Sequence, residues 1–394
     1  GRRRPVALEC AMDTWGRKGP VVLPKAAAEA DPCPVDDEAV VRAAKLLGSA
    51  QRPLIAVGGG AQGAGEHVVR LAEMLDAPVM TGRMGQGVID GRHRLSVTTV
   101  AGYNYWIEAD VVLVVGTRLQ APQMAWGIGT QKIVRIDIDS QELDRFRKPE
   151  IGIVGDATAT LKALADRLDG HNIKRNGRAE AVAEIKALAT KKVRETLAPQ
   201  IGYLEAIRAA LPEDGILVDE LTQMGYAARL AYPTYKSRTF LSPGYQGTLG
   251  WGYATSLGVK VAKPDTPVVS ISGDGGFLFT AMEMSTAAQN GIGVVAVVFS
   301  DGAYGNVKRI QQQSFNNRTI ASDLHNPDFV FCALTNSNAA MPVQVYLNTL
   351  SRSWPNTQIL VTGPQIVKRR DLKIPSNCLV MNDPMTFLRF LENH

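Results

Sequence analysis

The chain has 394 residues, more than one ordinary hydrophobic core contains, so we expect two or three domains. It is 45% hydrophobic and 21% charged and has 37 glycines, a composition that is typical of a globular α/β protein and excludes a disordered one. The longest apolar stretches, residues 111–116 and 294–299, are far shorter than the roughly 18 residues that a membrane helix needs. The composition therefore excludes a transmembrane protein and predicts no membrane partner.

The net charge of +5 comes from the two ends of the chain. Residues 1–10 contribute +2 (three arginines and one glutamate), residues 331–394 contribute +3 (six basic and three acidic residues), and residues 11–330 are neutral. No basic stripe interleaved with aromatic side chains accompanies these ends. We therefore expect no nucleic-acid partner.

The cysteines and histidines argue against a zinc site and for a reducing compartment. The four cysteines are scattered without a CxxC pair, and none of the five histidines is paired at metal-ligand spacing. No apolar signal-peptide core follows the N-terminal arginines, so we expect a cytoplasmic protein. The first residue is glycine rather than methionine, which indicates that the chain is part of a longer one.

Residues 37–168 alternate helical and strand-like patterns, which predicts βαβ units and a parallel sheet. Before them, residues 1–28 are punctuated by prolines, and residues 21–23 (VVL) are predicted to form a short strand. The elements expected in the domain at 37–168 are helices at 38–47 and 66–75, strands at 53–57, 111–115 and 133–138, and a glycine-rich turn at 58–65.

Residues 169–200 are predicted to be a helical linker to a second α/β domain. Residues 172–196 are rich in Ala, Lys and Glu and lack proline, which is typical of a solvated helix. The second domain is expected at 201–330. Its predicted elements are a helix from 203, a helix at 278–289, and strands at 215–218, 266–272 and 294–299.

The composition changes near residue 331. Residues 331–394 are poor in acidic residues and rich in Asn, and we expect an atypical C-terminal α/β segment. Its predicted elements are strands at 358–361 and 379–381 and helices at 343–350 and 385–391. Three origins of this segment remain open: a fused module, a frameshifted or recombined reading frame, and a diverged end.

The most informative segment is GDGGF at residues 273–277. Asp274 comes where one buried strand turns into a helix, and Asp301 comes 27 residues later, where the next strand ends in SDGAYGN. In a right-handed βαβ unit, both strand ends open on the same edge of the sheet. Free amides of glycines favour an anion there, and carboxylates beside an anion indicate a bridging hard cation. We expect a metal-bridged diphosphate, held by Asp274, Asp301 and the Ala303 carbonyl.

GDG alone is also typical of a turn in which the aspartate caps a helix. GDG after a strand, with Asp-Gly and AYG after the next strand, is more restrictive. This pattern resembles the thiamine-diphosphate-dependent enzymes of the acetolactate synthase and benzoylformate decarboxylase type, which often have asparagine where this chain has Asp301. The resemblance implies thiamine diphosphate and Mg²⁺ as cofactors. It also implies an α/β fold with two doubly wound parallel-sheet domains, a middle domain and a thiamine-diphosphate-binding domain.

The resemblance further implies which residues contact the cofactor. Residues 242–262 resemble the family segment over the aminopyrimidine ring, in which a carbonyl at Gly247 accepts a hydrogen bond and a side chain at Leu249 bends the cofactor into a V. The bend brings the 4′-imino nitrogen next to thiazolium C2. A buried core leucine is the alternative for Leu249, and packing is the alternative for Met224 in DELTQMG. The expected cofactor-binding residues are Gly247, Thr248, Leu249, Met224, Gly273, Gly275, Gly276, Tyr304, Gly305 and Asn306.

The glycine-rich turn at 58–65 could admit a nucleotide, since some relatives hold FAD or ADP in the middle domain. Asp137 and Asp139, at the end of a predicted strand, would be its partners. The sequence GGGAQGAG does not match the GxGxxG fingerprint cleanly, so a middle domain with a purely structural role is the alternative.

Residues 1–28 resemble only the end of the family's pyrimidine-binding domain. That domain carries the glutamate that hydrogen-bonds the pyrimidine N1′, so no catalytic residue is assignable in this chain, and neither Glu220 nor Glu283 is taken for that glutamate. In the family the active site lies between two subunits. We therefore expect a homo-oligomer and, for this chain alone, weak cofactor binding and little turnover.

The expected function is that of an acetolactate-synthase-like carboligase or decarboxylase acting on a small 2-keto acid, and the chain is expected to be an incomplete one. A benzoylformate-decarboxylase-like enzyme, which releases an aldehyde, is a sibling alternative. A non-catalytic binding or regulatory protein that retains the diphosphate-domain fold is the alternative from another class.

Overall fold

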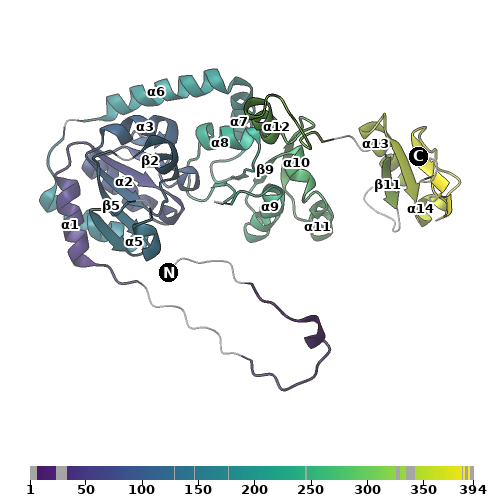
Figure 1. Ribbon diagram of the computed structural model, residues 1–394, viewed down its shortest axis with the longest axis horizontal. Coiled ribbons are helices and arrows are strands. Elements are labelled where there is room, and N and C mark those ends of the chain that lie inside the picture. Colours follow the sequence, from purple (N-terminus) through teal and green to yellow (C-terminus); the bar gives the residue numbers. More distant parts are fainter. Residues whose placement is uncertain are drawn as a thin grey trace. The chain divides into compact units, whose positions relative to one another are not determined.

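Figure 1 shows the computed structural model of the chain. The structure describes residues 7–23, 33–127, 129–145, 147–175, 177–244, 246–324, 329–333, 342–383, 385–386 and 389–390. The chain divides into two compact units, Gly1–Arg309 and Ile310–His394. The domain boundaries expected from the sequence stay predictions. Parts of the N-terminal segment (residues 1–6 and 24–28) and of the helix expected at 385–391 lie outside the described residues.

The middle domain is built on a six-stranded parallel sheet with the order β3-β2-β1-β4-β5-β6. This doubly wound order confirms the predicted α/β fold. All five residues of β1 and of β4 are buried, because helices cover both faces of the sheet. The strands are β1 (Pro53–Val57), β2 (Val79–Thr81), β3 (Ser96–Thr98), β4 (Val111–Val115), β5 (Lys132–Asp137) and β6 (Ile151–Val154).

Apolar residues at helical spacing form the inner faces of the helices of this domain. In the first helix, Ala39, Val40, Ala43 and Leu47 are all buried, and the carboxylate of Asp36 caps the helix by accepting a hydrogen bond from the Ala39 amide at 2.9 Å. The helices are α1 (Asp37–Gly48), α2 (Gly65–Leu75), α3 (Thr99–Glu108), α4 (Ser140–Leu143) and α5 (Ala157–Leu168).

Two helices, α6 (Ala179–Thr196) and α7 (Ala198–Ala210), connect the two sheets (Figure 1). The prediction of a solvated helix is confirmed for 179–196, where Val182 is the only buried residue. The helix begins later than residue 172, and the expected start was wrong. The Arg175 side chain donates hydrogen bonds to the Leu47 and Gly48 carbonyls at the end of α1, so the described residues before α6 are held in an irregular conformation.

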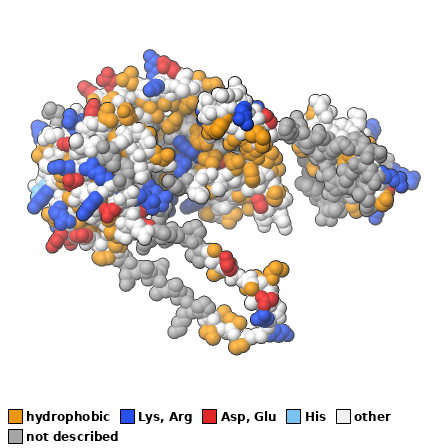
Figure 2. Space-filling model, in the orientation of Figure 1, with side chains coloured by type: hydrophobic (Ala, Val, Ile, Leu, Met, Phe, Trp, Pro, Cys, Tyr) orange, Lys and Arg blue, Asp and Glu red, His pale blue; other side chains and the backbone are white. Residues whose placement is uncertain are grey.

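The second sheet is also parallel, with the order β10-β9-β7-β8. Its strands are β7 (Ile216–Val218), β8 (Phe240–Leu241), β9 (Val268–Gly273) and β10 (Val295–Phe299). Its helices are α8 (Gln223–Ala231), α9 (Trp251–Ala262), α10 (Asp274–Leu278), α11 (Glu283–Asn290) and α12 (Gly305–Ser314). The edge strand β10 is partly exposed, and hydrophobic side chains gather over the domain that carries α8 to α11 (Figure 2).

The prediction of a single helix at 278–289 was wrong. The helical segment begins directly after β9, at Asp274, and residues 279–282 separate α10 from α11. The hydroxyl of Thr280 donates to the Gly250 carbonyl at 3.1 Å. This contact, between residues far apart in sequence, holds the break between α10 and α11. The spacing of apolar residues does not reveal such a break.

The second unit contains a small parallel sheet with the order β11-β12-β13 and two helices. The strands are β11 (Phe329–Ala333), β12 (Gln358–Thr362) and β13 (Cys378–Val380), and the helices are α13 (Val343–Ser353) and α14 (Pro364–Val367). The strands predicted at 358–361 and 379–381 and the helix predicted at 343–350 are confirmed. Leu347, Ile359 and Val361 are fully buried in its core.

The strand predicted at residues 21–23 was wrong. Val21, Val22 and Leu23 are 79%, 91% and 84% exposed and form no strand. A strand requires a neighbour for its backbone hydrogen bonds, and none pairs with these residues in the part of the chain that the structure describes. Among the described residues, no helix is both long enough and apolar enough to cross a membrane.

Candidate functional site

A cavity of about 430 Å³ lies where β9 and β10 end and α7 and α8 meet the sheet. Parallel strands place their carboxyl ends on one edge, so the segments that follow β9 and β10 come together there, as expected for ligand sites in open α/β sheets. Most of the residues expected at the cofactor line this cavity. They are Met224, Leu249, Gly273, Asp274, Gly275, Gly276, Asp301, Ala303, Tyr304, Gly305 and Asn306.

The Asp274 carboxylate is fixed by three hydrogen bonds. Its Oδ2 atom accepts from the Ser300 hydroxyl at 2.9 Å and from the Gly302 amide at 2.8 Å, and its Oδ1 atom accepts from the Gly275 amide at 2.8 Å. The contacts to Ser300 and Gly302 join the end of β9 to the end of β10. They orient the carboxylate, and Oδ1, which accepts one hydrogen bond, keeps a lone pair for a cation.

Asp301 lies on the opposite segment of the same cavity. Its Oδ1 atom accepts from the Ala303 amide at 3.2 Å, which folds residues 301–303 into a tight turn. A Cβ atom at Gly305 would lie 2.5 Å from Asp301 Oδ2, so only glycine fits beside this carboxylate. Among the described residues, no three His, Cys, Asp or Glu side chains gather around one point. Mg²⁺ often takes only one or two protein carboxylates, so Asp274 and Asp301, which both line the cavity, could hold it.

The loop before α9 reaches the cavity through Leu249. Leu249 is 36% exposed and lines the cavity, so it is not the buried core leucine of the alternative interpretation. Gly247 and Thr248 precede it on the same loop and are not among the lining residues. Gly247 has a φ of +60°, which favours glycine, and a Cβ atom there would approach Leu221 Cδ1 to 3.2 Å.

Sequence reasoning missed the wall of the cavity that the helices contribute. Gln200 and Tyr203 from α7 and Tyr226 from α8 line it. The Tyr203 ring packs edge-on against Phe299, at the end of β10, with 5.3 Å between the ring centroids. No local sequence signal could have found these residues, because only the packing of α7 and α8 on the sheet brings them to the strand ends.

Two buried acidic residues, Asp219 and Glu220, follow β7 directly behind the cavity. Both are 0% exposed. Asp219 Oδ2 accepts from Arg229 Nε at 2.9 Å, but burial outweighs the Arg229 charge and raises the pKa of Asp219 to about 6. Burial also raises the pKa of Glu220, and the Ser272 hydroxyl and the backbone amides of Gly250 and Trp251 oppose this shift.

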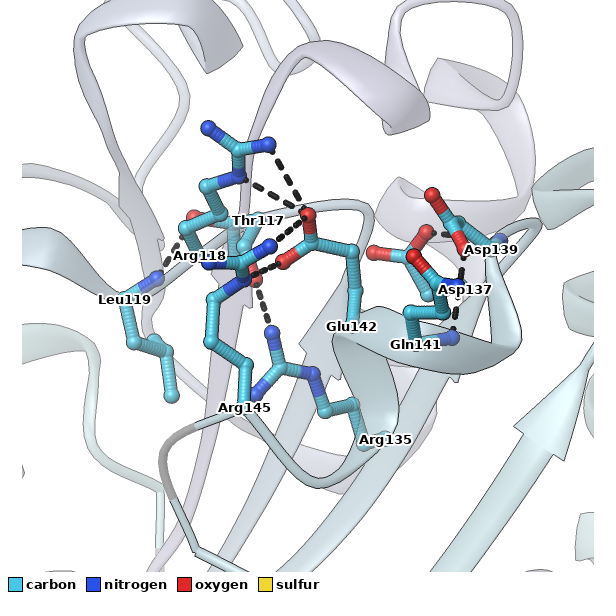
Figure 3. A network of polar contacts seen from close by, with 9 residues as sticks. All are labelled: Thr117, Arg118, Leu119, Arg135, Asp137, Asp139, Gln141, Glu142 and Arg145. Atoms are coloured by element: carbon cyan, nitrogen blue, oxygen red, sulfur yellow. Dashed lines mark hydrogen bonds and ion pairs between the residues drawn. The ribbon is translucent and has the colours of Figure 1, made fainter. Parts of the chain in front are cut away.

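The corresponding strand-end edge of the middle domain carries a network of charged side chains (Figure 3). Glu142 is 2% exposed and accepts hydrogen bonds from Arg118 at 2.9 Å and from Arg145 at 3.0 Å. Asp137 accepts from the amide of Asp139, whose own carboxylate caps α4 through the Gln141 amide.

Two glycines of the glycine-rich turn of this domain pack closely against the end of β4. The Gly58 and Gly60 amides donate to the Val115 and Gly116 carbonyls at 3.0 and 3.1 Å. A Cβ atom at Gly60 would lie 2.7 Å from Gly116 Cα. These two amides are already paired with backbone carbonyls, so Gly58 and Gly60 serve close backbone packing. FAD or ADP at this edge, with Asp137 and Asp139 as partners, stays a prediction that the contacts do not support.

Comparison with known protein families agrees with both sheet domains. Residues 40–164 match the family described as "Thiamine pyrophosphate enzyme, central domain", and residues 221–345 match "Thiamine pyrophosphate enzyme, C-terminal TPP binding domain". The second match covers the expected diphosphate-binding segment, residues 273–306. Thiamine diphosphate as the family's cofactor is therefore confirmed for the domain that contains the cavity.

Three curated relatives give the same result. A probable 2-ketoarginine decarboxylase of Pseudomonas aeruginosa is 32% identical over 346 residues, which are 83% of this chain and 60% of that protein. A probable acetolactate synthase large subunit of Methanocaldococcus jannaschii is 33% identical over 74% of this chain and 53% of its own length. An acetolactate synthase of Arthrospira platensis is 30% identical over 93% of this chain and 70% of its own length.

The chain spans little more than half of the length of the first two of these relatives. The matched part nevertheless includes both sheet domains and the turn that carries Asp274. By sequence and by fold, the chain belongs to the family of thiamine-diphosphate-dependent enzymes.

Proposed function

We propose that this chain provides the diphosphate- and metal-binding part of a thiamine-diphosphate-dependent carboligase or decarboxylase that acts on 2-keto acids. The observation that carries the proposal is the convergence of Asp274, Asp301 and Leu249 on one cavity of about 430 Å³. Relatives named acetolactate synthase and 2-ketoarginine decarboxylase support both reaction types.

The residues around the cavity fit the cofactor's two ends. Asp274, Asp301 and the Ala303 carbonyl would hold Mg²⁺, which commonly joins protein carboxylates to substrate phosphates. Leu249 would support the pyrimidine end, since its side chain is held at the cavity by the loop before α9. Bound thiamine diphosphate supplies the electron sink that the decarboxylation of a 2-keto acid requires.

The diphosphate end depends on glycines and on the residues that start α12. Gly273, Gly275 and Gly276 keep the β9 turn free of side chains, so that backbone approaches the ligand closely. Tyr304, Gly305 and Asn306 form the opposite rim of the cavity. In this division of roles, the phosphates would lie between the two carboxylate-bearing turns.

Three further properties belong to the same proposal. The substrate is a small-molecule 2-keto acid, the assembly is a homo-oligomer, and the location is cytoplasmic. Membership of the family supports the substrate and the assembly, and the scattered cysteines support the location.

Calorimetric titration of the purified chain with thiamine diphosphate tests the proposal, with Mg²⁺ in one series and EDTA in another. We expect heat of binding only with Mg²⁺, and its loss in Asp274→Ala. The matched control is Asp265→Ala, which removes an exposed aspartate of the same domain away from the cavity. Equal binding with EDTA, or equal affinity in the two variants, contradicts the proposal. If Asp274 served only as a helix cap, its replacement by alanine would lower the stability by about 1 kcal/mol and leave the affinity unchanged.

A further inference from the structure

Glu220 is a buried carboxylate without a cationic partner in the described part of the chain. It follows β7, it is 0% exposed, and the polar groups beside it are uncharged: the Ser272 hydroxyl and the backbone amides of Gly250 and Trp251. Burying a carboxyl group in this way costs free energy, and an apolar side chain of similar size would avoid the cost. The position of Glu220 therefore calls for an explanation beyond the stability of the sheet.

The contacts of Glu220 lie where the cofactor loop meets the diphosphate turn. Its Oε1 atom accepts a hydrogen bond from the Gly250 amide, one residue after Leu249. The Gly250 carbonyl in turn accepts from the Thr280 hydroxyl, just beyond α10. Both polar groups of the Gly250 backbone are thus tied, one to the end of β7 and one to the segment after the Asp274 turn.

Two glycines, Gly276 and Gly252, make room for this carboxylate. A Cβ atom at Gly276 would lie 2.7 Å from Glu220 Oε1, and one at Gly252 would lie 3.0 Å from Glu220 Oε2. Gly250 itself has a φ of +82°, and a Cβ atom there would lie 2.8 Å from Phe279 Cβ. The carboxylate therefore sits in a space that side chains on either segment would fill. Any shift of one segment against the other would move it.

We propose that Glu220 is a positioning residue that sets the distance between the pyrimidine end and the diphosphate end of the cofactor site. Through Gly250 it holds the loop that carries Gly247 and Leu249 against the turn that carries Asp274. It does not line the cavity, so it acts through Gly250 rather than by touching the cofactor. This inference rests on the proposed function of the same cavity.

Amide hydrogen exchange in the absence of ligand tests whether the hydrogen bond between Glu220 and the Gly250 amide holds the loop. In Glu220→Ala, we expect exchange at residues 247–252 to rise at least about tenfold, the factor that corresponds to 1.4 kcal/mol. In Glu220→Gln, the side-chain carbonyl still accepts from the Gly250 amide, so exchange should stay near the wild-type rate. Glu283→Gln is the matched control, because Glu283 is partly exposed and its carboxylate accepts from the hydroxyl of Thr286 in the same helix. Unchanged exchange in a folded Glu220→Ala overturns the proposal.

Ligand affinity tests the consequence for the site. Glu220→Ala should bind Mg²⁺–thiamine diphosphate at least about tenfold more weakly, while Mg²⁺ with inorganic diphosphate, which uses only the turn end, should change less than about threefold. Equal losses for the two ligands would indicate general destabilisation and overturn the positioning role. If Glu220→Ala does not fold, Glu220→Asp, which shortens the reach to Gly250, should give the same split and the same rise in exchange. A wild-type chain that binds no thiamine diphosphate contradicts the proposed function. The exchange experiment tests the role of Glu220 whether or not the cofactor binds.

Discussion

The buried carboxylate of Asp219 should make the stability of this protein depend on pH in an unusual direction. Asp219 is fully buried, and one of its oxygens pairs with Arg229 Nε at 2.9 Å. Burial raises its pKa from 3.8 to about 6. The folded chain therefore keeps this proton at pH values where the unfolded chain has lost it.

The sign follows from proton linkage. Between about pH 4 and pH 6 the folded state binds more protons at Asp219 than the unfolded state, so the free energy of unfolding falls as the pH rises through this window. The stabilising contribution is complete below the unfolded pKa and is lost above pH 6. With these two pKa values, the change from pH 7 to pH 5 adds about 1 kcal/mol to the free energy of unfolding.

Urea unfolding at pH 5 and pH 7 measures this contribution in the wild type and in Asp219→Asn, which has nearly the same shape and no titrating proton. We expect the wild type to gain about 1 kcal/mol more than the variant on going from pH 7 to pH 5. Asp265→Asn, at an exposed site of the same domain, is the control and should behave as the wild type. Identical pH dependence in Asp219→Asn and the wild type would refute the argument that burial controls this carboxyl group.

Three other substitutions test the packing and the site. Gly225→Ala should lower the free energy of unfolding by about 3 kcal/mol in urea, since the added Cβ would lie 1.9 Å from the Glu220 carbonyl oxygen; a loss below 1 kcal/mol would contradict this steric argument. Leu249→Ala should weaken thiamine diphosphate binding in calorimetry but change stability by less than about 1 kcal/mol, because the side chain is already 36% exposed; the reverse pattern would make it a core residue. Val295→Lys should reduce aggregation in light scattering, because it adds a charge to the exposed edge strand β10. Unchanged aggregation would show that the strand β10 is not the surface through which the chain associates.

The local pattern of the chain determined the fold class and the chemistry of the strand ends. Alternating βαβ signals predicted both parallel sheets, because buried strands and amphipathic helices differ in period. GDG after β9 and Asp-Gly after β10 predicted that Asp274 and Asp301 share one edge, since parallel strands impose this geometry. The structure indeed places both on one cavity. These inferences needed only residue order and the handedness of the crossover.

Other features depended on contacts between distant segments, and the sequence could not supply them. The predicted helix at 278–289 is interrupted because Thr280 bonds to Gly250, and Tyr203 reaches the cavity because α7 packs on the sheet. The glycines at 58–65 suggest a phosphate loop in sequence, yet the Gly58 and Gly60 amides donate to the carbonyls of Val115 and Gly116. Glycine permits either a ligand or another backbone to approach closely, and only the tertiary structure decides which of the two occupies the space.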